Sequence, residues 1–234
     1  MPSTASRVRL LVLAAALPAL VALAGCGDVA IEPEPEAVVG AGEIVSDDRS
    51  AGPIERISVG ADIQVVIRTG TPGSVTLAAQ ENLLPLVRTE VRDGQLIVNV
   101  PSPGYVTQEP VTLTVVAPLI TAITLSGGAD GALEFVGDAL GVDLSGAASV
   151  TGIGRAEALT VTASSEARID FTDLVAATAD VRLSGGAGAI LAVDEALTGD
   201  ASGGATVTLT TPTPSVDVTT SSGGSVQGGP SPSP

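Results

Sequence analysis

The chain has 234 residues, with 26 acidic and 10 basic side chains, no His, one Cys and a formal net charge of −16. Such an acidic chain is repelled by phosphate backbones and by anionic lipid headgroups, which argues against nucleic-acid binding. A single Cys excludes an internal disulfide, and without His the usual nucleophile–base pairs of hydrolases cannot be built.

Residues 1–25 are predicted to be a lipoprotein signal peptide. Arg7 and Arg9 precede an apolar run over 10–24, which is short for a membrane span and is interrupted by Pro18. The run ends in Leu-Ala-Gly-Cys, which resembles the lipobox of bacterial lipoproteins. The resemblance implies cleavage before Cys26 and lipid on its thiol. Two or more acyl chains anchor a protein stably, so we expect an exported, lipid-anchored protein on the extracytoplasmic face of the cell membrane.

The segment 26–53 is predicted to be a disordered spacer. It carries Pro33, Pro35 and alternating Glu residues, a composition typical of extended, charged chain. The Pro- and Ser-rich tail 228–234 is also predicted to be disordered. The folded part is therefore expected over 54–227.

From residue 54 to about 118 the sequence alternates apolar and polar residues, as in "DIQVVIRTG", "SVTLAA" and "VTLTVVAP". Asp93-Gly94 separates two alternating runs and predicts a β-hairpin. The apolar stretch 82–86 is expected to turn over an open end of the core. No segment of the mature chain shows a sustained helical period, so the fold class is all-β.

A repeat occupies the second half of the chain. Serines recur at intervals of 19, 19, 20, 18 and 19 residues, most of them followed by Gly, and each follows an alternating strand: Ser126, Ser145, Ser164, Ser184, Ser202 and Ser221. Each unit is thus two short strands joined at a Ser-Gly corner, with one apolar face that only stacking can bury. This predicts a single-stranded β-helix, or β-solenoid, with coils of about 19 residues. We expect the serine hydroxyls to bond corner backbone groups. A β-sandwich is the competing fold, but its strands need no such period.

The stretches "ISVGADIQVVIRTG", "VTLAAQENLLPLVRTEVRDGQLIVNV" and "VVAPLITAITLSGGAD", with the later Leu-Ser-Gly corners, resemble the bacterial family described as putative auto-transporter adhesin, head GIN domain. The resemblance covers about 57–227. It implies a right-handed β-helix in an exported or surface-anchored protein, and it supplies no catalytic residues and no cofactor.

The repeat disfavours three kinds of chemistry. Carboxylates near the coil surfaces do not share a column, which disfavours a glycosidase pair: Glu134, Asp138, Asp143, Asp170, Asp173 and Asp180. Positions four residues past each serine vary too much for a calcium ladder: Asp130, Ser149, Arg168, Gly188, Thr206 and Ser225. Only one coil has both outward threonines, Thr160 and Thr162, so an ice-binding ladder is disfavoured as well. We therefore expect no metal and no cofactor.

The sequence favours a non-catalytic binding or adhesion role at the cell envelope. Apart from the membrane itself, envelope proteins or extracellular glycans are the expected partners. The alternative is an envelope structural or sensing component without an external ligand. A carbohydrate-active enzyme is the remote alternative.

Overall fold

The computed structural model describes residues 36–49 and 52–228. The signal peptide, Cys26, the first part of the predicted spacer and nearly all of the tail lie outside these residues. In the part that is described, no helix has the length and apolar character needed to cross a membrane. All regular structure there is β, which confirms the predicted class.

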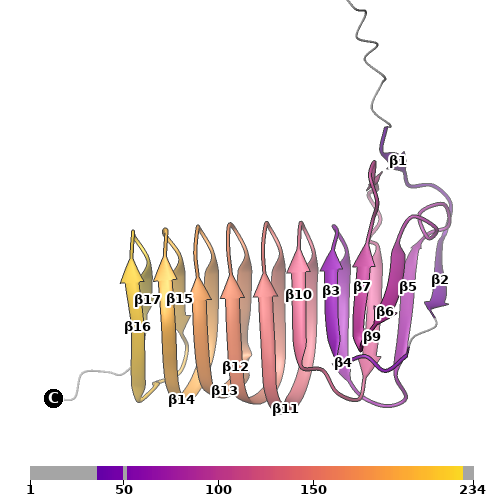
Figure 1. The fold of residues 1–234 in the computed structure, drawn as a ribbon. Helices are drawn as coiled ribbons and strands as arrows, with labels where there is room; N and C mark the ends of the chain where they lie inside the picture. Colours follow the sequence, from indigo (N-terminus) through magenta and orange to yellow (C-terminus); the bar gives the residue numbers. More distant parts are fainter. Residues whose placement is uncertain (1–35, 50–51, 229–234) are drawn as a thin grey trace, which may run out of the picture. The chain divides into compact units, whose positions relative to one another are not determined.

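The second half of the domain is a parallel β-solenoid (Figure 1). Its strands follow one another along the axis: β10 (Ala122–Ser126), β11 (Asp130–Leu144), β12 (Ser149–Ala163), β13 (Arg168–Leu183), β14 (Gly188–Ser202), β15 (Thr206–Leu209), β16 (Ser215–Ser221) and β17 (Ser225–Gln227). Each long strand bends midway and contributes to two sheets. The first part of β11 pairs with β4, for example, whereas its last residues pair with β10. The predicted solenoid with 19-residue coils is confirmed.

The two sheets are named by their relation to the serine corner. The pre-corner sheet contains β10, the second halves of β11–β14, and β16; the post-corner sheet contains the first halves of β11–β14, β15 and β17. Alternate side chains of both sheets point inward, as the sequence alternation predicted. Leu140, Val142 and Leu144 are at most 3% exposed before their corner, and Ile169 and Phe171 at most 2% exposed after theirs.

Two further coils precede β10, but their spatial order differs from their chain order. β3 (Arg56–Gly60) extends the pre-corner sheet beyond β10, and β4 (Gln64–Thr69) extends the post-corner sheet beyond β11. Together they form the coil that stacks on β10 and β11. β7 (Gln95–Asn99) and β9 (Thr112–Ala117) form the coil on the far side of β3 and β4. The earlier coil is therefore enclosed between two later ones.

Antiparallel strands cover this end of the stack. β6 (Arg88–Arg92) folds onto β7 through the predicted turn, in which Asp93 has φ 48° and Gly94 φ 74°. β5 (Ser74–Gln80) pairs with β9, and Leu83 in the turn that follows is fully buried. The hairpin and the apolar turn are confirmed as the cover of one end of the core.

The predicted disordered spacer needs a correction. Residues that were assigned to it form β2 (Ile44–Arg49), which pairs antiparallel with β5, and β1 (Val38–Val39), which pairs with β8 (Tyr105–Val106). The Thr76 hydroxyl also donates to Asp48 at 2.9 Å. Charged residues on an edge strand look like spacer in a sequence, because the ladder uses backbone groups and leaves the side chains of 44–48 exposed. The folded part therefore begins before residue 54.

Backbone groups rather than hydroxyls hold the serine corners. The amides of Ser145 and Ser164 each donate to the carbonyl of the preceding coil at 3.0 Å, and Ser202 is in register with Ser221. Within residues 36–49 and 52–228, none of the six serine hydroxyls forms a hydrogen bond, so the expected bonds to the corner backbone are not found. The serines are small corner residues whose amides join the ladder.

Inside five of the six serine corners lies a column of alanine that was not predicted from the sequence. Each Ala stands three residues past its serine and is at most 1% exposed: Ala129, Ala148, Ala167, Ala187 and Ala205. The carbonyl of each accepts an amide hydrogen bond from the next coil at 2.9 Å. A methyl group fills the corner, where a larger side chain would force the two sheets apart.

Candidate binding surface

The outer side of the pre-corner sheet is polar, and Asp180 and Arg182 form an ion pair on it. The Arg182 guanidinium lies 2.7 Å from the Asp180 carboxylate on the same strand, and Asp180 also accepts a hydrogen bond from Thr198 at 3.2 Å. Asp200 is beside Arg182 in register, yet of the two aspartates only Asp180 is within ion-pair distance. Asp180 thus forms one ion pair and accepts one threonine hydrogen bond, and Asp200 takes part in neither.

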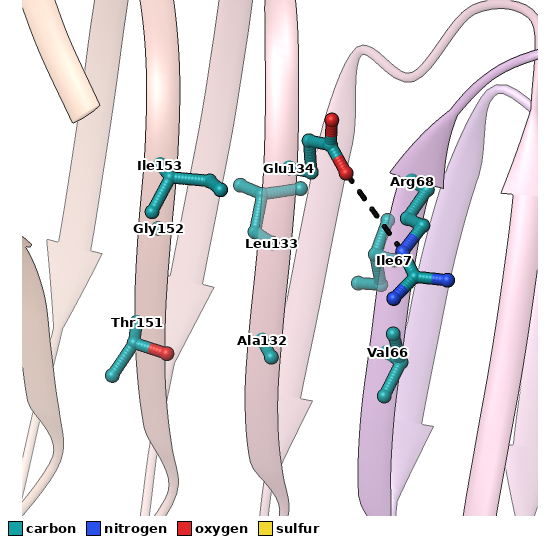
Figure 2. Close-up of a pocket in the computed structure, with 9 residues that line it drawn as sticks. All are labelled: Val66, Ile67, Arg68, Ala132, Leu133, Glu134, Thr151, Gly152 and Ile153. Carbon is teal, nitrogen blue, oxygen red and sulfur yellow. Dashed lines mark ion pairs between the residues drawn. The ribbon is translucent and has the colours of Figure 1, made fainter. Parts of the chain in front are cut away.

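The outer side of the post-corner sheet is hollowed and more apolar. A shallow depression of about 170 Å³ lies over β4, β11 and β12, with Val66, Ala132, Thr151 and Ile153 among its lining residues (Figure 2). Arg68 and Glu134 face each other at its rim, with guanidinium Nε 3.8 Å from the carboxylate Oε2. Both side chains are more than half exposed, so the ion pair contributes at most a few tenths of a kcal/mol.

A second depression, of about 300 Å³, continues over β12, β13, β14 and β15. Thr151 lines both depressions, and Arg168, Ile190 and Thr208 line the second. Gly188 also lines the second depression, and a Cβ at this position would have no atom within 4 Å. The absence of a side chain at Gly188 therefore leaves space in the depression. Together the two depressions form one strip across six strands, which we call the post-corner groove.

The groove can bind by contact but cannot enclose a ligand. Ile153 is 53% exposed and Ile190 is 37% exposed, and both stand among hydroxyl and small side chains. Sites for small molecules are deeper and cover most of the ligand's surface. A shallow strip with aliphatic contacts and threonine hydroxyls suits an extended partner that lies across several rungs.

The carboxylates considered for glycoside hydrolysis are not brought together. Glu134 faces Arg68, and Asp170 accepts hydrogen bonds from the amide and hydroxyl of Thr172. Asp143 and Asp180 lie on the pre-corner sheet, which is the opposite face. Asp138 and Asp173 lie at or beside the second bend of their coils. Each acid has its own local environment, and no two of them flank the groove as a facing pair.

The column four residues past each corner lies in register, as the spacing predicted. It runs from Asp130 through Ser149, Arg168, Gly188 and Thr206 to Ser225. The Ser149 hydroxyl donates to Asp130 at 2.6 Å. In the part of the chain that the structure describes, no three His, Cys, Asp or Glu side chains are grouped as metal ligands.

The exposed isoleucines of the groove, Ile153 and Ile190, were not predicted from the sequence. The signal was available, because residues 150 and 191 point inward and alternation along their strands then places 153 and 190 outside.

A polar cleft of about 520 Å³ lies beside the turn that joins β3 to β4, and Tyr105, the only tyrosine of the chain, lines it. The Tyr105 hydroxyl donates to the backbone carbonyl of Asp62 and so links β8 to the turn between β3 and β4. Burial, and secondarily the charge of Asp62, raises the pKa of Tyr105 to about 12. This hydroxyl stays protonated at physiological pH and serves as a fixed structural donor.

Comparison with known proteins agrees with this architecture. The family model described as "Putative auto-transporter adhesin, head GIN domain" matches residues 54–212, and the chain belongs to this family. Among curated proteins, none matches the sequence.

Solved structures show the same fold at low sequence identity. A putative adhesin from Bacteroides fragilis has a TM-score of 0.66 and 12% identity, and one from Parabacteroides merdae has 0.51 and 15%. A putative lipid binding protein from Parabacteroides distasonis has 0.51 and 11%. Each alignment covers 82% of this chain and 99% of the other.

Proposed function

We propose that this member of the head GIN domain family is an exported, lipid-anchored protein that binds an extended partner at the cell envelope through the post-corner groove, without catalysis. The observation that carries the proposal is the groove itself: two joined depressions over six strands that expose Ile153 and Ile190 beside threonine hydroxyls. A solenoid repeats its outward positions at every rung, so a chain-like partner meets similar contacts along its length.

The names of the relatives support a binding role. Two of the similar structures are named "putative adhesin" and one "putative lipid binding protein", and none of the three carries the name of an enzyme. The family description is likewise that of an adhesin. These names belong to those proteins, and at such identities the structures themselves establish only the fold.

The chemistry of the groove narrows the partner. Both phenylalanines, Phe135 and Phe171, are buried, so the groove has no aromatic platform for stacking on sugar rings. Aliphatic and hydroxyl contacts suit a protein segment better. The net charge of −16 disfavours an anionic partner. An uncharged or basic segment of an envelope or surface protein therefore fits best, with extracellular glycans as the second class.

The test measures retention of the exported chain carrying Cys26→Ser on immobilised envelope proteins, whole cells and glycans. Ile153→Asp and Ile190→Asp are expected to reduce retention at least tenfold, since each places a carboxylate in the apolar part of the groove. Thr160→Asp adds the same charge at an exposed position of the opposite sheet and is expected to bind like the wild type. Absence of retention on every surface, or equal loss in all three variants, would refute the assignment of the groove.

A further inference from the structure

The two ends of the solenoid are built differently. At the end formed early in the chain, the sheets finish in β2 and β6, which carry six charged residues among their eleven. At the other end the sheets finish in β16 and β17, where Asp217 is the one charged residue among ten. Charged edge strands prevent sheets from pairing edge to edge. Only the β2–β6 end has this protection.

The β16–β17 end has unused pairing capacity. In the part of the chain that the structure describes, β16 pairs only with β14 and β17 only with β15, so one edge of each strand has no neighbouring strand. Inward-facing Val216, Val218 and Val226 are only partly buried, whereas Leu197 and Val207 at equivalent positions of the coils before are fully buried. β16 and β17 are the last strands of the stack (Figure 1), so inward-facing side chains and backbone groups both end at this surface.

We propose that the β16–β17 end binds a second copy of this chain and forms a symmetric end-to-end dimer. A two-fold axis perpendicular to the sheets would place β16 antiparallel to β16 of the second copy, and β17 antiparallel to its β17. Both sheets and the narrow core would then continue from one solenoid into the next. Val216, Val218 and Val226 of one copy would pack against the valines of the other. Such a contact is isologous, so it closes after two copies and does not grow into a fibre.

Charge favours a second copy joined in this way over other arrangements. Two chains of net charge −16 repel each other over most of their surfaces. Residues 201–228 contain a single charge, Asp217, so this end is where two copies can approach at the lowest electrostatic cost. A head-to-tail contact would instead set the end that carries only Asp217 against the antiparallel edges of β2 and β6, whose six charged side chains would lose solvent.

The last six residues, Gly-Pro-Ser-Pro-Ser-Pro, are a poorer occupant for these edges, because three prolines supply no N–H for a ladder. The contact between two copies is nevertheless small, with ten strand residues from each. Interfaces below about 1,000 Å² are typical of weak association. We therefore expect dissociation in the micromolar range or above, with the equilibrium sensitive to one charge at the edge.

Sedimentation velocity of the exported chain carrying Cys26→Ser, from about 1 μM to about 1 mM, tests the proposal. A reversible monomer–dimer equilibrium is expected. Thr219→Asp adds a carboxylate to the exposed side of β16, on the face that carries Asp217 of both copies, and is expected to weaken the dimer at least tenfold. Thr160→Asp, the same change at an exposed threonine in the middle of the same sheet, is expected to leave it unchanged.

Cross-linking locates the contact and does not depend on the stability of a variant. With Cys26 replaced, Thr219→Cys is expected to give a covalent dimer with a short thiol cross-linker, and Thr160→Cys is not. A wild type that stays monomeric up to about 1 mM, or a dimer that Thr219→Asp does not weaken, would overturn the proposal. A chain that dimerises only after removal of 229–234 would identify the tail as the occupant and would overturn it equally.

Discussion

The ring of Phe171 occupies the space that a side chain on Gly152 would need. A Cβ at Gly152 would lie 2.7 Å from two ring carbons of Phe171 and 3.0 Å from Leu174. Phe171 is fully buried, and the inward position of the coil before it is the one left without a side chain. A solenoid this narrow accepts a large ring only where the adjacent coil is reduced to glycine.

Gly152→Ala is therefore expected to destabilise the protein by about 1–3 kcal/mol, the cost typical of overpacking a close-packed core. Phe171→Leu also destabilises alone, but it removes the ring that the new methyl group meets. The double variant should be more stable than the sum of the two changes predicts, by at least about 0.5 kcal/mol. Denaturant unfolding of the four proteins gives this coupling, and strict additivity would show that the two residues do not share space.

Gly199→Ala is expected to cost at least about 2 kcal/mol. Gly199 has φ 128°, which L side chains rarely adopt, and its Cβ would lie 1.9 Å from the carbonyl oxygen of Val181 in the neighbouring coil. Gly188→Ala is the matched control, because its Cβ meets nothing within 4 Å. The control should change the free energy of unfolding by less than about 0.5 kcal/mol. Equal effects at the two sites would contradict this account.

Tyr105 should titrate near pH 12 in the folded protein and near pH 10 in denaturant, the ordinary value for tyrosine. Above pH 10 the unfolded chain loses the phenolic proton while the folded chain keeps it. The stability that Tyr105 contributes is therefore complete below pH 10 and is lost as pH rises towards 12. With one Tyr and no Trp, the ultraviolet absorbance of tyrosinate reports this group alone. Tyr105→Phe should remove the titration and flatten the stability curve in this window.

Cys26→Ser is expected to release the exported protein from the membrane. Without the thiol no acyl chains can be attached, and the described part of the chain has no apolar helix that could replace them. Detergent-phase partitioning of wild type and variant measures the change, and mass spectrometry of the mature N-terminus shows the lipid directly. Unchanged partitioning of the variant would mean that the lipobox resemblance misidentifies the anchor.

Much of the solenoid could be predicted because its information is local and periodic. Alternation between residues 140 and 144 fixes which side chains point inward, and the 19-residue interval fixes which rungs lie over one another. The corner alanines follow the same period and could have been found from it. The groove was only partly predictable, because its depth depends on side chains of six strands and on the missing side chain of Gly188.

Sequence alone determined the class of the fold, the length of a coil and the side of each strand that faces the core. These follow from strand parity and period, which act between neighbours along the chain. The tertiary structure alone decided that the β7–β9 coil precedes the β3–β4 coil in space, and that a charged segment before residue 50 is an edge strand. Backbone ladders carry almost no side-chain signature, so which strands pair at each end of the stack depends on contacts that no local pattern records.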